Sequence, residues 1–155
     1  MTMTRMIATV GSIVFALGFS SVAQAGECPA DKRGENLAKL VTTAAKDVTD
    51  TVIASTNLAD EMIGAKDHQF RLRKLVIKPG GVVPWHSHGD RPAIIYIVEG
   101  EITEYASTCA VPILHKAGDV ARETHTTAHW WKNTGSKTVT LLSADILHDP
   151  QDHNM

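Results

Sequence analysis

Short apolar runs recur every eight to twelve residues from Thr51 onward, and this spacing constrains the fold more than any other feature. Gly, Pro, Asn and Asp separate the runs, for example at 79–81, 118–119 and 133–135. Runs of this length between turn residues are typical of β-strands. The expected strands are 51–56, 68–77, 82–86, 93–99, 102–107, 111–115, 120–123, 128–133 and 139–147, with a helical turn at 58–62. Many short strands in series predict an all-β sandwich or barrel.

Residues 1–25 have the features of a secretory signal peptide. Arg5 precedes an apolar run at 7–19, and Ala23-Gln24-Ala25 has the small-x-small pattern that a signal peptidase cuts. The alternative is a transmembrane anchor, but the apolar run is short and no basic flank follows it. We therefore expect a periplasmic or secreted protein without membrane attachment after signal removal. The mature chain would begin at Gly26.

The 130 residues after the signal suffice for one domain with a core. Residues 26–50 are polar, and four apolar residues there recur at helical spacing: Leu37, Leu40, Val41 and Ala44. We expect a partly helical or mobile N-terminal arm at 26–50, a barrel domain at 51–148 and a polar tail at 149–155. The formal charge changes from −2 to −3 when Arg5 is removed, which suggests neither a nucleic acid nor an anionic membrane as partner. The basic residues Arg71, Arg73, Lys74 and Lys78 are interpreted as a solvated strand face.

Two cysteines, Cys28 and Cys109, remain after the signal. An even count in an oxidising compartment favours a disulfide between them. The alternative is that Cys109 is a metal ligand. Its place in the turn-like segment 107–110, far in sequence from the histidines discussed next, favours the disulfide.

His86 and His88 are the strongest candidates for chemistry. They lie two residues apart in an apolar segment of strand character, so both imidazoles point to the same face. Two imidazoles on one face can share a metal ion, although His-x-His pairs also occur among ordinary core and surface histidines. The sequence contains no glycine-rich phosphate loop and no nucleophile elbow.

At these residues the sequence resembles the cupin superfamily. Gly80, His86, His88 and Gly100 fit the first cupin motif, but Ala93 stands where the motif has a glutamate. The second motif is matched by Gly118, His129 and Asn133, whereas Thr124 and Thr126 replace its proline and a glycine. The resemblance covers residues 68–146. It implies an all-β fold, a small antiparallel β-barrel or jelly roll, here with a short N-terminal arm.

The resemblance also implies a metal site inside the barrel. His86, His88 and His129 would hold one divalent transition-metal ion, such as Fe, Zn, Cu, Ni or Mn. Because Ala93 has no donor atom, we expect a neutral three-His site, with Glu123 as the alternative carboxylate ligand. A neutral site would favour an anionic ligand. Further residues expected near the metal or the substrate are Glu123, His125, Arg91 and Trp131. Four other histidines have no partner at ligand spacing and are interpreted as ordinary: His68, His115, His148 and His153.

Three functions follow from this interpretation. The first is an exported metal-dependent enzyme with oxygenase- or isomerase-like chemistry on a small polar molecule. Some cupins with the same ligand change, such as thiol and diketone dioxygenases, use iron(II) and oxygen. The second is a non-catalytic protein that binds a metal or a small ligand, and the third is a structural module without a metal. Small cupins often pair through an edge strand, so the resemblance also allows a homodimer.

Overall fold

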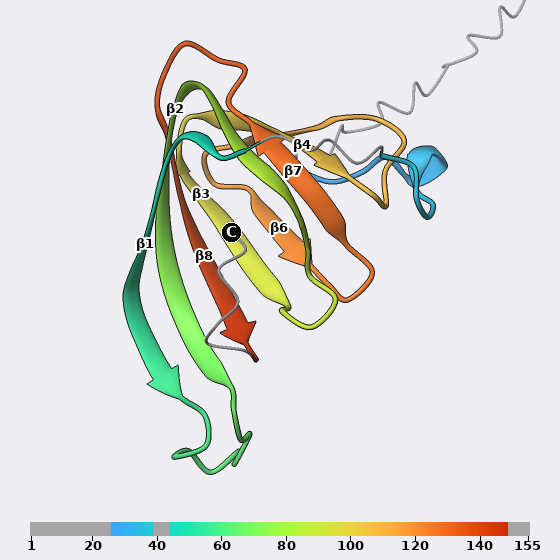
Figure 1. Cartoon of the computed structure of the whole chain (residues 1–155). Helices are drawn as coiled ribbons and strands as arrows, with labels where there is room; N and C mark the ends of the chain where they lie inside the picture. Colours follow the sequence, from blue (N-terminus) through green and yellow to red (C-terminus); the bar gives the residue numbers. More distant parts are fainter. Residues whose placement is uncertain (1–25, 39–43, 149–155) are drawn as a thin grey trace, which may run out of the picture.

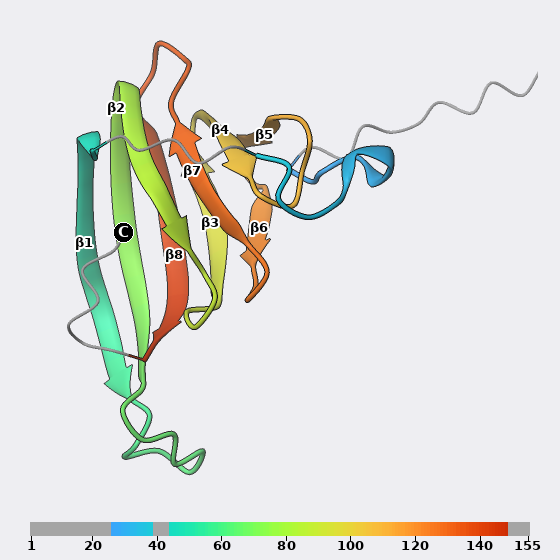
Figure 2. The same cartoon turned by 45° about the vertical axis from the view of Figure 1, so that its right-hand side comes forward.

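The computed structural model describes residues 26–38 and 44–148. Eight strands form one antiparallel sheet that curls into a nearly closed barrel (Figures 1 and 2). Their order in the sheet is β5-β4-β7-β2-β8-β3-β6, and β1 pairs with β2 beside this path. The strands are β1 (Lys46–Asn57), β2 (Gln69–Ser87), β3 (Ala93–Glu99), β4 (Glu101–Ala106), β5 (Ile113–Lys116), β6 (Val120–Glu123), β7 (Ala128–Lys132) and β8 (Val139–Leu147). The all-β barrel expected from the sequence is confirmed.

Strand β2 connects the two halves of the barrel. It pairs with β8 up to Ile77 and with β7 from Val82 onward, while β1 pairs with it from Gln69 to Val82. Two strands were expected here because Pro79, Gly80 and Gly81 interrupt the apolar pattern. The structure keeps one strand because its pairing passes from β8 to β7 at these residues.

Every expected strand overlaps a strand of the structure, and three of the nine have the same bounds. The ranges 93–99, 120–123 and 139–147 are reproduced without change. β1 instead begins at Lys46, five residues before the expected start, and residues 58–62 form turns rather than a helix. Of the apolar residues at helical spacing, Leu40 and Val41 lie outside the described residues, and neither Leu37 nor Ala44 lies in a helix.

Alternating side chains fill the barrel. β8 alternates buried and half-buried positions along its whole length, as period-2 strand geometry requires. The main core cluster joins inward residues from six strands: Leu75, Ile77, Val83, Ile95, Ile97, Ile102, Ala121, Trp131, Val139 and Leu141. This apolar cluster lies inside the barrel next to the histidines and forms part of the wall of their cavity.

The motif residues that are not histidines hold turns. Gly80, Gly100 and Gly118 have φ values of 77°, 84° and 96°, which favour glycine. A Cβ on Gly100 would also lie 3.0 Å from the carbonyl oxygen of Thr138. Asn133 is fully buried, and its Nδ2 donates hydrogen bonds to the carbonyl oxygens of Ile77 (3.0 Å) and Lys137 (2.8 Å). This asparagine therefore fixes the β7–β8 connection against β2.

Residues 26–38 pack on the barrel and contain a short 3-10 helix, Ala30–Lys32. The predicted disulfide between Cys28 and Cys109 is confirmed, with a Cα–Cα distance of 5.8 Å. Backbone bonds from Gly34 N to Thr108 O (3.1 Å) and from Leu37 N to Ser107 O (2.9 Å) add to it. The expected signal peptide at 1–25 and the polar tail at 149–155 lie outside the described residues. Within the described part of the chain, no helix is long and apolar enough to cross a membrane.

Candidate metal centre

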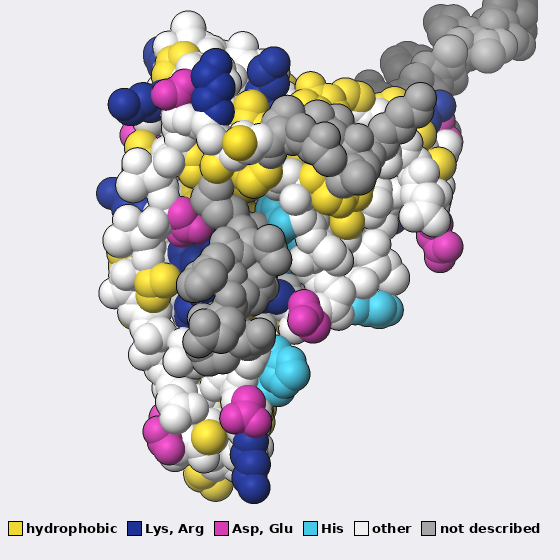
Figure 3. Space-filling model, in the orientation of Figure 1, with side chains coloured by type: hydrophobic (Ala, Val, Ile, Leu, Met, Phe, Trp, Pro, Cys, Tyr) yellow, Lys and Arg dark blue, Asp and Glu magenta, His cyan; other side chains and the backbone are white. Residues whose placement is uncertain are grey.

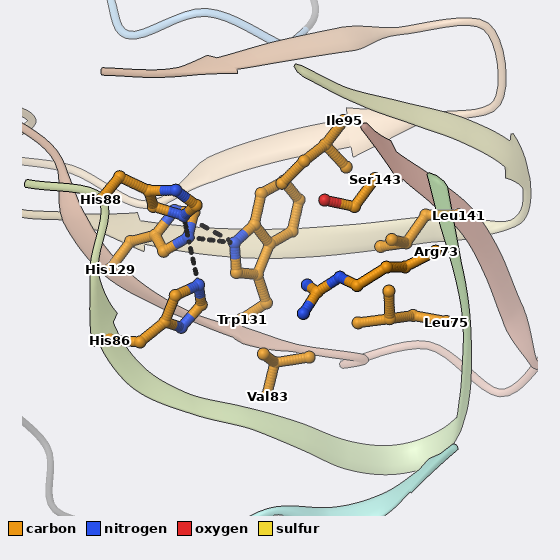
Figure 4. Close-up of a pocket in the computed structure, with 10 residues that line it drawn as sticks. All are labelled: Arg73, Leu75, Val83, His86, His88, Ile95, His129, Trp131, Leu141 and Ser143. Carbon is orange, nitrogen blue, oxygen red and sulfur yellow. Dashed lines mark hydrogen bonds between the residues drawn. The ribbon is translucent and has the colours of Figure 1, made fainter. Parts of the chain in front are cut away.

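Three histidines from two adjacent strands meet inside the barrel (Figure 4). His86 lies near the end of β2, His88 follows this strand, and His129 lies on β7, where its backbone pairs with that of His86. The Nε2 atom of His129 lies 3.0 Å from Nε2 of His88 and 3.1 Å from Nε2 of His86. The convergence that the cupin resemblance implied is therefore present.

The other ring nitrogen of each histidine faces a hydrogen-bond acceptor. Nδ1 of His86 lies 2.9 Å from the Pro84 carbonyl oxygen, and Nδ1 of His88 lies 2.7 Å from that of Arg91. Nδ1 of His129 lies 2.8 Å from Oε1 of Glu104. An Nδ1–H that donates to an acceptor leaves Nε2 with a lone pair.

Three lone pairs that face one another need a positive charge between them. A proton on His129 Nε2 would satisfy one of its two neighbours at a time, whereas one metal ion would accept all three lone pairs. Hydrogen bonding of the distal ring nitrogen to carbonyl or carboxylate groups is the usual support of metal-binding histidines. The three residues therefore fit a divalent transition-metal ion.

The electrostatic environment keeps two of these ligands neutral. Burial lowers the pKa of His86 to about 2 and that of His88 to about 4, and the charge of nearby His129 adds to both shifts. Burial also disfavours the charged form of His129, but the carboxylates of Glu123 and Glu104 outweigh it and raise the pKa. His86 and His88 are thus available as neutral ligands at neutral pH.

A buried glutamate links His129 to a second histidine. Glu104 on β4 lies 2.8 Å from His129 Nδ1 through Oε1 and 2.8 Å from His115 Nε2 through Oε2. Burial opposes ionisation of Glu104, but the hydrogen bonds from His115 and His129 prevail and lower its pKa to about 2. Glu104 was not among the site residues expected from the sequence, and His115 was interpreted as an ordinary histidine. Strand alternation could have indicated Glu104, because it shares the inward face of Ile102 and Ala106.

Ala93, which stands where the cupin motif has a glutamate, lies between two carboxylates from neighbouring strands. Ala93 on β3 pairs with Glu123 on β6 and with Asp145 on β8, and both side chains are buried. Asp145 forms a two-pronged ion pair with Arg71, with distances of 2.9 and 2.7 Å. Oε2 of Glu123 lies 3.5 Å from Nδ1 of His129.

Glu123 therefore lies on the Nδ1 side of His129 and not among the three Nε2 atoms. Two groups of ligand-type side chains share His129: His86, His88 and His129 form one, and Glu104, Glu123 and His129 form the other. Burial raises the pKa of Glu123 to about 7, a shift that His129 opposes and Glu104 reinforces. Of the two ligand sets left open by the sequence, this geometry favours the three-His set.

Of the other expected site residues, one is exposed and two are buried. His125 is exposed and belongs to neither group. Trp131 is buried, and its indole Nε1 lies 3.1 Å from Nδ1 and 3.3 Å from Nε2 of His129. Arg91 is buried, with Nε 4.0 Å from Oδ2 of Asp145. The interior at this end of the barrel is polar enough to hold a guanidinium group.

A small cavity of about 20 Å³ lies beside the histidines. Its wall contains Arg73 and Ser143 together with apolar side chains, which are Leu75, Val83, Ile95, Trp131 and Leu141. Arg73 is 7% exposed and forms ion pairs with Asp50 (3.2 Å) and Asp145 (3.6 Å).

The interpretation of Arg71 and Arg73 as a solvated face is wrong, because both share the inward face of β2 with Leu75 and Ile77. In the space-filling view, histidine appears in a recess between hydrophobic side chains (Figure 3).

Comparison with known proteins identifies the family to which this barrel is similar. Residues 73–145 match the family description of the cupin domain. A protein from Thermus thermophilus is 16% identical, with a TM-score of 0.50 over 70% of this chain and 89% of its own. A cupin 2 conserved barrel domain protein from Salinispora arenicola is 14% identical, with a TM-score of 0.49 over 70% of this chain and 79% of its own. At these identities the similarity concerns the fold alone, and a comparison with curated proteins finds no match. On the match of residues 73–145 and the barrel around them, the chain belongs to the cupin superfamily.

Proposed function

We propose that this protein is an exported, metal-dependent cupin enzyme that acts on a small polar molecule. His86, His88 and His129 hold one divalent transition-metal ion. The observation that carries this proposal is the arrangement of the three imidazoles, whose Nε2 atoms face one another while each Nδ1 faces an acceptor.

The adjoining cavity supports turnover rather than storage of the metal. When bound, such an ion would supply a Lewis acid or a redox centre next to the cavity. Arg73 and Ser143 offer polar groups that can orient a ligand, and the apolar wall around Trp131 excludes bulk water from it. His86 is only partly buried.

A non-catalytic metal- or ligand-binding protein is the second candidate. The close contact between the Trp131 indole and His129 favours it, because this side chain covers part of the space in front of the ring. In that case the protein would retain metal and small ligands without converting them.

Export is supported by the Cys28–Cys109 disulfide, because such bonds persist in oxidising compartments.

A homodimer is supported by the outer face of β3, where Ile94, Tyr96 and Val98 are 57%, 45% and 45% exposed. Sedimentation of the purified protein tests for the dimer, and a monomer at all concentrations would contradict this proposal.

The test of function begins with protein purified from its native compartment. Metal analysis by mass spectrometry should find about one transition-metal ion per chain, and a His88→Ala variant should contain none. Oxygen uptake is then measured with a panel of small thiols and diketones, and ligand conversion by NMR. Stoichiometric metal without conversion of any compound would favour the binding protein. Protein without metal would overturn the proposal.

A further inference from the structure

We infer that the cavity binds a short organic anion, whose carboxylate is held by Arg73 and Ser143. This inference deepens the proposed function and rests on it for the chemistry that follows, because it names the class of substrate. It concerns the wall of the cavity that the metal would not occupy.

Sheet register places these two polar residues side by side. Arg73 on β2 pairs with Ser143 on β8, and Ser143 pairs with Ile95 on β3. All three side chains point inward and line the cavity (Figure 4). The next inward row along the same strands, Leu75, Leu141 and Ile97, is apolar. The pair thus lies between this apolar row and the charged row of Arg71 and Asp145.

Both residues offer hydrogen-bond donors to the cavity, and one donor of Arg73 has no hydrogen-bond partner in the described part of the chain. Nε of Arg73 is buried and makes no hydrogen bond there, although the carboxylate of Asp145 lies 3.6 Å away. Ser143 is 2% exposed, and its hydroxyl points into the cavity in Figure 4. A buried donor left unsatisfied costs free energy, which a bound acceptor would recover.

The chemistry of the ligand follows from these donors and from the space. A guanidinium group beside a hydroxyl group is suited to a carboxylate, because both donate and neither needs to accept. The surrounding side chains of Leu75, Ile95 and Leu141 suit an apolar remainder. A cavity of about 20 Å³ has room for only a few non-hydrogen atoms, so the anion has to be short.

The experiment measures binding of formate, acetate and butyrate by calorimetry, with acetamide as the neutral counterpart of acetate. Protein with and without one equivalent of Zn²⁺ is compared. We expect acetate and formate to bind, butyrate to bind more weakly and acetamide not to bind. Ser143→Ala should weaken acetate about tenfold to a hundredfold, since hydrogen bonds to charged groups have this magnitude.

Arg73→Lys provides a second, independent variant that keeps the positive charge beside Asp50 and Asp145. It should weaken acetate by about tenfold, because the Nε–H donor and the planar geometry are lost. Ser55→Ala, on the exposed outer strand β1, is the matched control and should bind acetate as the unaltered protein does. Thermal unfolding of each variant shows whether it is folded, and Ser143→Ala removes only one oxygen atom.

The inference is overturned if no carboxylate binds, if acetamide binds as well as acetate, or if both variants leave acetate affinity unchanged. Binding that requires Zn²⁺ but ignores both variants also overturns it, because the anion would then contact the metal alone. Zn²⁺ uptake is measured separately in the same samples. Absence of Zn²⁺ uptake with intact acetate binding would refute the proposed function and leave the anion site standing.

Discussion

The two sides of the His129 ring differ in their chemistry. On the Nε2 side lie His86 and His88, whose pKa values are held at about 2 and about 4 mainly by burial, and a largely apolar cavity. We call this the imidazole side. On the Nδ1 side lie Glu104, at 2.8 Å, and Glu123, at 3.5 Å, with His115 behind Glu104. We call this the carboxylate side.

The difference shows how one ring can serve two purposes. The imidazole side presents neutral lone pairs that can receive a metal ion, whereas the carboxylate side fixes the ring by a charged hydrogen bond. A ring held in this way cannot rotate freely, which preserves the direction of Nε2. The predictions below test whether the two sides are as separate as the geometry indicates.

The largest effect should come from removing a ligand on the imidazole side. His86→Ala, His88→Ala and His129→Ala should each abolish stoichiometric metal binding, because two remaining imidazoles hold an ion far more weakly. Calorimetric titration with Zn²⁺ measures this. His125→Ala is the control, since His125 is exposed and lies in neither group. Retained stoichiometric binding in any of the three variants would show that another residue belongs to the site.

Removing the disulfide should lower stability strongly and leave the imidazole side intact. Cys28 lies next to the carboxylate side, where it lines a groove with Glu104 and Glu123. Closing a chain segment with a sequence separation of 81 should stabilise the fold by up to about 4 kcal/mol. Urea unfolding of a Cys28→Ser, Cys109→Ser double variant measures the loss. If the folded variant also lost Zn²⁺ binding, the two sides would be coupled through the N-terminal segment.

Glu104→Gln should weaken metal binding about tenfold to a hundredfold, as loss of a carboxylate behind a ligating histidine typically does. The amide keeps the size of the side chain but offers one acceptor oxygen where His115 and His129 now use two. Glu101→Gln, at an exposed position of the same strand, is the matched control. Unchanged Zn²⁺ affinity of Glu104→Gln would mean that packing alone orients His129.

The metal-free protein should lose stability as the pH falls from about 6.5 to about 4.5. In this window the unfolded chain protonates His86 and His88, while the folded chain keeps both neutral because their pKa values are lowered to about 2 and about 4. Glu123 acts in the opposite direction, because its pKa of about 7 lets the folded chain bind a proton that the unfolded chain releases above pH 4.5. The unfolded state therefore binds about one proton more, which gives a loss of about 1.4 kcal/mol per pH unit.

Urea unfolding at a series of pH values measures this slope. His88→Gln should reduce it to near zero, because one of the two histidine contributions disappears. A slope of opposite sign in the unaltered protein would mean that the carboxylate side dominates the titration.

The smallest effect should come from Glu123→Gln. Its carboxylate faces Nδ1 of His129 and not the three Nε2 atoms, and the distance of 3.5 Å is too long for a hydrogen bond, so Zn²⁺ affinity should change by less than about threefold. The isosteric amide avoids a new cavity. If this variant emptied the site as thoroughly as His129→Ala does, the site would be a three-His-one-carboxylate site rebuilt around Ala93.

The sequence by itself determined the barrel, the disulfide and the three histidines. Strand spacing and turn residues are local signals, and the period-2 alternation placed His86 and His88 on one face before any partner was known. The even cysteine count indicated the bond between Cys28 and Cys109. Motif spacing added His129, because the order of ligands along the chain is a property that a family resemblance preserves.

Only the tertiary structure decided what surrounds these ligands. Glu104 meets His129 from 25 positions away because β4 pairs with β7, and the row Asp145, Ala93 and Glu123 exists because β8, β3 and β6 are neighbours in one register. Burial of Arg73 likewise depends on which face of β2 the barrel closes over. Cross-strand neighbours are set by long-range pairing, and a shift of register by one residue would exchange every inward side chain for an outward one. The support of His129 and the polar wall of the cavity therefore became visible only when the strands were assembled.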